Sequence, residues 1–233
     1  TKPRDSYFLT TKLPVMMIQS LEDAKRIYQE QKQRLHKDYF DFYLFHNVCE
    51  MNIDAYLDPQ YGIFEYLMEQ KKNGRIRHLG FSCHGNLPVL KRFLEAYGKD
   101  MEFCQLQLNY IDWTFQGGKE KVDLLNEYHI PVWVMEPLRG GRLARLSEEE
   151  AAPLKTMRPD ETIPAWAFRF LQSIPSVTVV LSGMSDLEQM KANIATFQTE
   201  APLNEKEMDG LMEVAGGMVS QTALPCTACH YCV

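Results

Sequence analysis

Lys71-Lys72-Asn73-Gly74-Arg75-Ile76-Arg77-His78-Leu79-Gly80-Phe81-Ser82 joins the end of one predicted helix to a predicted strand. Two lysines suit the carboxyl end of a helix, and Gly74 suits the left-handed residue that follows it. The apolar run Ile76–Phe81 is typical of a strand that is buried on both faces. A helix that leads directly into such a strand is the repeating unit of an α/β fold with a parallel sheet.

The same alternation of strand and helix continues in both directions along the chain. Helices are predicted to begin at Ser20, at Asn86 and at Ser185, where Ser185 and Glu188 have the spacing of a capping box. The strands are predicted at Tyr7–Thr11, Phe40–Phe45, Ile76–Phe81, Phe103–Leu108, Val132–Met135 and Val177–Leu181.

The spacing of the strands favours a (β/α)₈ barrel over a doubly wound sheet. Polar residues follow the six predicted strands at intervals of 27 to 46 residues, at Lys12, His46, Ser82, Asn109, Glu136 and Ser182. A barrel averages roughly 30 residues per strand–helix unit. No G-x-G-x-x-G follows the first strand, which weakens the Rossmann alternative. We therefore expect a TIM barrel with six of its eight units in this chain.

Two further segments complete the predicted organisation. Gly140–Glu161 is expected to be a long charged loop, either a solvated helical turn or a flap over the barrel mouth. A helix is expected from Asn204, ending at Gly216-Gly217 before a cysteine-rich tail. We divide the chain into an incomplete barrel at residues 1–200 and a C-terminal helix and tail at residues 201–233.

Composition excludes several classes of function. The formal charge is −6 and no basic stripe stands out, so no nucleic-acid partner is expected. No apolar run approaches 18 residues, and no signal peptide is recognised, so we expect no membrane span. Cys49, Cys83 and Cys104 are scattered among apolar residues, as reduced core cysteines are. A cytoplasmic location is the expectation.

The tail carries three cysteines in a C-x₂-C-x₂-C pattern, at Cys226, Cys229 and Cys232. This spacing begins the bacterial iron–sulfur run C-x₂-C-x₂-C-x₃-C-P. A zinc site or a reactive thiol cluster is the alternative, but zinc sites usually pair C-x₂-C with a distant second pair, and the chain has none. We favour a [4Fe–4S] cluster completed by a cysteine beyond Val233.

Several stretches taken together resemble the aldo-keto reductase family. The resemblance runs in order from Tyr7 to Phe197, and the tail resembles the subgroup that adds a ferredoxin-like iron–sulfur segment. The stretches are Thr10-Thr11-Lys12, Asp41–His46, Lys72–Ser82, Gln107–Tyr110, Glu136–Leu143 and Leu181–Ser185.

The resemblance implies a (β/α)₈ barrel that uses NAD(P)H to reduce an aldehyde or a ketone by hydride transfer. Lys12 and His46 match the family's catalytic lysine and histidine, whereas its aspartate and tyrosine would lie before Thr1. A tyrosine is too weak an acid to protonate the substrate unless a neighbouring cation lowers its pKa. Lys12 would supply that cation, and His46 would orient the carbonyl oxygen.

The resemblance also implies a cofactor site. Cys83 replaces an asparagine that many members have, and Met135 an aromatic residue. Gln189 replaces an arginine that many use against the 2′-phosphate, so NADP is favoured only weakly over NAD. Ser82 and Gln107 would hold the nicotinamide carboxamide; Glu136, Leu138 and Gly140 the pyrophosphate; and Ser182, Gly183, Met184, Gln189 and Asn193 the adenosine end.

Three functional interpretations stay open. The first is an NAD(P)H-dependent oxidoreductase with a small-molecule carbonyl substrate, an iron–sulfur segment and a redox partner protein. The second is an electron-transfer or interaction protein that uses the barrel as a scaffold. The third is an inactive fragment, because a barrel opened by two strands exposes its edges and core. The sequence leaves open the substrate, the number of clusters and the oligomeric state.

Overall fold

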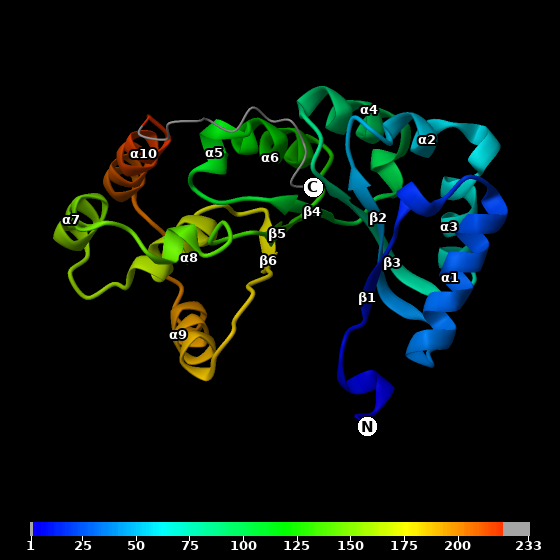
Figure 1. Ribbon diagram of the computed structural model, residues 1–233, viewed down its shortest axis with the longest axis horizontal. Coiled ribbons are helices and arrows are strands. Elements are labelled where there is room, and N and C mark those ends of the chain that lie inside the picture. The colour runs from blue at the N-terminus through cyan, green and yellow to red at the C-terminus, as the bar shows by residue number, and fades with distance from the viewer. Residues whose placement is uncertain (1, 221–233) are drawn as a thin grey trace. The chain divides into compact units, whose positions relative to one another are not determined.

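The computed structural model describes residues 2–220 (Figure 1). Six strands form one sheet in the order β1-β2-β3-β4-β5-β6, in which β1 pairs with β2, β2 with β3 and β5 with β6 in parallel. The chain divides into two compact units. Among the described residues, the first comprises residues 2–105 and Leu124–Pro131, and the second comprises Leu106–Asp123 and residues 132–220.

Each unit contains strands and helices in alternation. The first unit holds β1 (Thr10–Leu13), α1 (Leu21–Leu35), β2 (Phe40–Val48), α2 (Ile53–Leu57), α3 (Ile63–Lys72), β3 (Ile76–Cys83), α4 (Leu87–Tyr97) and the start of β4 (Cys104–Gln107). The second holds α5 (Asp112–Phe115), β5 (Val132–Met135), α7 (Glu148–Met157), α8 (Ile163–Gln172), β6 (Val177–Val180), α9 (Leu187–Gln198) and α10 (Glu205–Ser220). Helix α6 (Gly118–Glu127) contributes to both.

The first three strands end later than the sequence predicted. β1 runs over Thr10–Leu13 rather than Tyr7–Thr11, and β2 and β3 continue to Val48 and Cys83. Lys12, His46 and Ser82 therefore lie within strands instead of directly after them. The reason is burial: Leu13, Val48 and Cys83 are all enclosed in the core, whereas Phe8 is exposed.

Packing between β3 and the chain before β4 requires a glycine. Gly80 pairs with Leu44 in the register between β2 and β3. A Cβ atom on Gly80 would stand 2.5 Å from the Phe103 carbonyl oxygen, which is a steric clash with the backbone. The Phe103 ring beside it packs edge-to-face against Phe42.

Most predicted helix boundaries are confirmed, but the start of α9 is not. Ser20 and Asn86 accept the capping bonds of α1 and α4, and Gly74 follows α3 with a positive φ of 71°. The cap of α9 is Asp186 rather than Ser185, because the Asp186 carboxylate accepts the Gln189 N–H at 2.8 Å. Gln189 in turn accepts the Ser185 N–H, so the helix begins one residue later than predicted.

The C-terminal helix starts where predicted but continues further. Asn204 caps α10 by accepting the Glu207 N–H. The helix runs through Gly216 and Gly217 to Ser220. The residues that flank the two glycines, Ala215 and Met218, are buried, and their packing stabilises the helical conformation of the glycines between them. The predicted division of the chain at residue 200 stays a prediction.

The segment expected to be a long loop contains a regular helix. Ser147 and Glu150 form a capping box at the start of α7, in which each side chain accepts the other residue's backbone N–H. Ala151 and Leu154 are buried, and the helix packs against α10 and α8. The interpretation of this segment as helical is therefore confirmed over Glu148–Met157, and the expected loop is wrong there.

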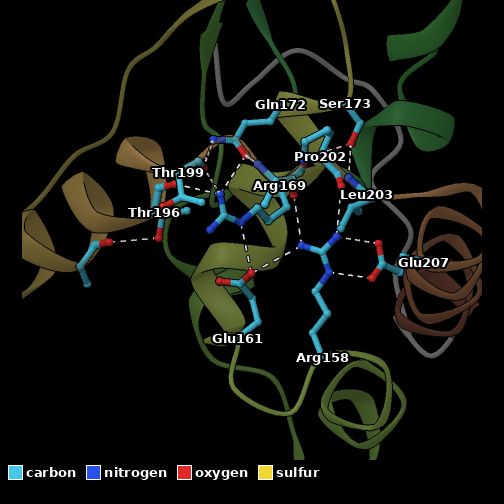
Figure 2. Close-up of polar contacts among 12 residues, drawn as sticks. Arg158, Glu161, Arg169, Gln172, Ser173, Thr196, Thr199, Pro202, Leu203 and Glu207 are labelled. Carbon is cyan, nitrogen blue, oxygen red and sulfur yellow. Dashed lines mark hydrogen bonds and ion pairs between the residues drawn. The ribbon is translucent and has the colours of Figure 1, made fainter.

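Two arginines connect α10 and the chain before it to α7 and α8 (Figure 2). Arg158 donates two hydrogen bonds to the Glu207 carboxylate, at 2.7 and 2.6 Å, and others to the carbonyls of Ala201 and Pro202. Arg169 is buried and donates to the Thr196 carbonyl at 2.8 Å. Glu161 pairs with both guanidinium groups.

Residues 2–220 contain neither a candidate membrane span nor a candidate metal site. None of the helices there is long and apolar enough to cross a membrane. No group of three or more His, Cys, Asp and Glu side chains in that range could hold a metal ion. The predicted cluster ligands Cys226, Cys229 and Cys232 lie outside the described residues.

Candidate functional site

Lys12 and His46 lie at the same end of the β1–β2 pair. Lys12 pairs with Leu44 in the strand register, two residues before His46. Burial lowers the pKa of Lys12. Burial also lowers the pKa of His46, and the positive charge of Lys12 lowers it further. The two side chains are therefore close enough to interact, and the neutral form of His46 is favoured.

Hydrogen bonds from the surrounding helices fix the backbone that carries these two residues. Gln31 on α1 donates to the Lys12 carbonyl at 2.8 Å, while its own amide oxygen accepts from the Tyr43 hydroxyl at 2.8 Å. Tyr56 on α2 is buried and donates to the His46 carbonyl at 2.6 Å. Both strand ends are thus held by buried or half-buried side chains that the sequence did not single out.

Ser82 takes part in an irregular stretch of strand directly after His46. Its hydroxyl oxygen accepts the Asn47 N–H at 2.8 Å, and Ser82 is fully buried. Asn47 has a positive φ of 56°, and the pairing of β2 with β3 shifts register at this point. Such irregularities often occur beside active sites, where they change the direction of a side chain. The Ser82 hydroxyl proton remains available to donate.

In the second unit, a buried carboxylate gathers the polar groups that follow β4. Asp112 is completely buried, and its Oδ2 accepts from the Gln107 amide at 2.9 Å and from the Asn109 amide at 2.7 Å. Asn109 also donates to the Glu136 carbonyl at 3.1 Å, at the end of β5. The strand ends of β4 and β5 are therefore joined through side chains.

The loop after β5 adopts an unusual backbone conformation. Glu136 and Arg139 both have positive φ angles, of 58° and 47°, and Gly140 and Gly141 follow with positive φ as well. The Glu136 carboxylate accepts the Gly140 N–H at 2.5 Å. Since this bond stays within the loop, Glu136 acts first as a structural residue there. Leu138 and Gly140, by contrast, face the cleft described next.

A cleft of about 660 Å³ lies wholly within the second unit. It is enclosed by the loop after β5, the start of α8 and the first turns of α9. Asn193 donates to the Ser182 hydroxyl at 3.3 Å across one wall. Seven of the residues predicted to bind the cofactor line it, namely Leu138, Gly140, Ser182, Gly183, Met184, Gln189 and Asn193.

Sequence reasoning missed the charge of this cleft. Arg145 lines the wall and has no carboxylate partner among the described residues, while Glu188 on the same cleft is paired with Lys191. Arg145 is the only arginine or lysine among the residues that line the cleft in the described part of the chain. Its place on the cleft wall depends on the fold of the loop after β5, which the sequence alone does not give.

The predicted site residues fall into two groups. Lys12, His46 and Ser82 belong to the first unit, and all those from Gln107 to Asn193 belong to the second. Gln107 and Glu136 do not line the cleft. The prediction that both groups meet at one mouth stays a prediction. Gln105, buried two residues before Gln107 on β4, is a further amide that the sequence analysis passed over.

The family model "Aldo/keto reductase family" matches residues 1–215. The chain belongs to this family. In sequence it is 24% identical, over 200 residues, to the uncharacterized oxidoreductase YqkF of Bacillus subtilis strain 168. That match covers 76% of this chain and 61% of the relative, so the chain spans about three fifths of the length of this aldo/keto reductase relative.

Solved aldo/keto reductase structures share the fold. The apo form of AKR11C1 from Bacillus halodurans superimposes with a TM-score of 0.72 at 23% identity, over 91% of this chain and 72% of that one. An enzyme from Klebsiella pneumoniae, in complex with NADP and acetate, gives 0.72 at 18% identity, over 91% and 71%. The predicted α/β fold of aldo/keto reductase barrel type is confirmed.

Proposed function

We propose that this chain carries the nicotinamide-cofactor site of an oxidoreductase that reduces an aldehyde or a ketone. The observation that carries the proposal is the cleft of about 660 Å³ in the second unit, lined by seven of the predicted cofactor residues. Membership of the aldo/keto reductase family supports it. So does the presence of NADP in the structure of the Klebsiella pneumoniae relative.

The chemistry of the cleft suits the adenosine end of a dinucleotide. Gly183 leaves open space, Ser182 and Asn193 supply a hydroxyl and an amide, and the first turn of α9 borders the cleft. Helix N-termini favour anions. Arg145 would supply a positive charge for the 2′-phosphate, which the neutral Gln189 cannot. This charge favours NADP over NAD.

Lys12 and His46 would serve the reacting carbonyl. When bound, the cofactor supplies the hydride. Lys12 would place a positive charge beside the proton donor and lower the donor's pKa. His46 is neutral near pH 7 because burial and the Lys12 charge lower its pKa. A neutral imidazole can still donate an N–H to the carbonyl oxygen and so orient the substrate.

Filling the cleft tests this proposal. A Cβ atom on Gly183 would meet no heavy atom within 4 Å, and its φ is not in the left-handed region, so Gly183→Trp should fold and fill the cleft. Gly216→Trp is the matched control, because Gly216 on α10 has the same open surroundings and lies outside the cleft. NADPH titrated by quenching of protein fluorescence should bind wild type and Gly216→Trp, but not Gly183→Trp. Equal binding by all three would reject the proposed site.

The cysteine tail supports a second activity, electron transfer through a [4Fe–4S] cluster to a redox partner protein. The support is the C-x₂-C-x₂-C spacing, which provides three of the four thiolates that a cubane cluster takes. Anaerobic reconstitution followed by iron and sulfide analysis, and EPR after reduction, tests it. Stoichiometric zinc without labile sulfide would return the tail to a structural metal site. The buried cysteines Cys49, Cys83 and Cys104 agree with a reducing cytoplasmic location.

A further inference from the structure

Asp112 is a completely buried carboxylate that no predicted role explains. A buried charge is costly unless it is paired and hydrogen-bonded. Its Oδ2 accepts the Gln107 and Asn109 amides, and its Oδ1 lies 3.4 Å from the Arg139 guanidinium. Its backbone N–H is accepted by Asn109 Oδ1. Each of these three side-chain partners belongs to a strand end or to the loop that borders the cleft.

The carboxylate decides which way the Gln107 amide faces. An ionised carboxylate only accepts hydrogen bonds, so it must take the NH₂ group of Gln107. The amide oxygen of Gln107 is then turned away from Asp112 and stays available as an acceptor. A nicotinamide carboxamide offers an NH₂ group, for which an acceptor is required. Without the charge at Asp112, the amide could rotate and present a donor instead.

The same carboxylate holds the loop after β5. Arg139 sits in the left-handed region with a φ of 47°, between Leu138 and Gly140, both of which line the cleft. Its guanidinium pairs with Asp112 and lies over the Phe115 ring at 5.6 Å from the centroid. Asn109, bonded to Asp112, also holds the Glu136 carbonyl. The unusual loop backbone is thus tied to one buried charge.

We propose that Asp112 is a positioning residue for the cofactor: it orients Gln107 toward the nicotinamide carboxamide and, through Arg139, holds the loop that borders the phosphates. This inference rests on the proposed cofactor site. It assigns to one carboxylate the alignment of the nicotinamide and of the phosphates within the second unit, and it requires no direct contact between Asp112 and the ligand.

Two ligands and two substitutions test the proposal. NADPH is compared with 2′-phospho-ADP-ribose, which lacks only the nicotinamide ring. Arg139→Gln loosens the loop alone and should weaken both ligands equally. In Asp112→Ala both functions are lost, so NADPH should weaken about tenfold more than the ring-free ligand, which corresponds to about 1.4 kcal/mol. Circular dichroism and thermal melting check that each variant is folded at the assay temperature.

Replacing both charged residues, Asp112 and Arg139, with neutral amides should restore cofactor binding. This double variant also keeps the proposal testable if Asp112→Ala does not fold. In Asp112→Asn alone, the new NH₂ group must face either Arg139 or the amides of Gln107 and Asn109. In both positions two hydrogen-bond donors face each other and no hydrogen bond forms. In Asp112→Asn with Arg139→Gln, the new NH₂ can donate to the amide oxygen introduced at position 139, so affinity for NADPH should recover relative to Asp112→Asn. Absence of recovery, or the same loss for both ligands in Asp112→Ala, would overturn the proposal. Failure of wild type to bind either ligand would reject the cofactor site itself.

Discussion

At the scale of single residues, the interaction between Lys12 and His46 can be measured directly. Burial is the larger cause of the lowered His46 pKa, and the Lys12 charge is the smaller one. Lys12→Met removes the charge and keeps an apolar stem, so the His46 pKa should rise but stay below its ordinary value. NMR titration of the His46 ring proton, identified with His46→Gln, measures this. An unchanged pKa would show that the two side chains do not interact.

Asp41 makes the stability of the first unit sensitive to acid. Burial raises the pKa of its carboxyl, but the Leu9 N–H, the Arg4 hydrogen bond and the charges of Arg4 and Arg77 together lower it. A carboxyl with a lowered native pKa stabilises the fold above its unfolded pKa of about 3.9, and this is lost as pH falls through the native value.

Asp41→Asn should therefore cost about 2 kcal/mol at pH 7, where hydrogen bonds to a charged group are lost. The difference between wild type and variant should shrink as the pH falls below about 4. Urea unfolding at pH 7 and pH 3 measures it. Asp54→Asn is the control, because Asp54 is highly exposed and pairs with the exposed Arg92. A difference independent of pH would contradict the ionic origin.

At the scale of elements, the Arg158–Glu207 pair anchors α10 (Figure 2). Both side chains are mostly buried, and Arg158 joins the helix to two carbonyls of the preceding chain. Glu207→Gln should lower the free energy of unfolding by about 2 kcal/mol, since two charge-assisted hydrogen bonds are weakened. Glu205→Gln, at an exposed position of the same helix, should change it by less than about 0.5 kcal/mol. Equal effects would show that the pair is not an anchor.

The predicted elements agree with the structure where local signals decide them. Ser20, Asn86 and Asn204 cap helices because their side chains reach N–H groups three residues ahead. The start of α9 was misplaced because Ser185 and Asp186 both can cap, and only the position of Gln189 selects between them. The continuation of α10 through two glycines depends on burial against other helices, which sequence does not show.

The candidate site was predictable only in part, for a similar reason. Residues of the cleft wall follow motifs of contiguous sequence, such as Ser182-Gly183-Met184. Arg145 and Asp112 act through the positions that folding gives them, across the loop after β5 and the short helix after β4. Asp112 contacts Gln107 and Asn109 nearby in the chain, but its burial and its pairing with Arg139 arise only when the chain folds, so no local pattern identifies its role.

At the scale of the whole chain, apolar side chains on α9 stay exposed. Leu187, Met190, Ile194 and Phe197 recur at helical spacing, and each is at least 42% exposed. Exposed apolar stripes promote association. The purified chain should therefore self-associate with increasing concentration, and Ile194→Glu should reduce this in sedimentation velocity. Lys191→Glu, on the same helix, is the charge control. Equal association of both variants and wild type would show that the stripe is not responsible.

Gly80 has a consequence for how the first sheet strands assemble. The backbone of β3 passes so near Phe103 that no side chain fits at that point. Sliding β3 by two residues keeps the same face inward but would place His78 or Ser82 there, and both carry a Cβ atom. Misaligned pairings that preserve the apolar pattern are therefore rejected by the backbone itself. Gly80 therefore fixes the register of β3 during folding. The same register keeps Ser82 beside Asn47 at the strand end.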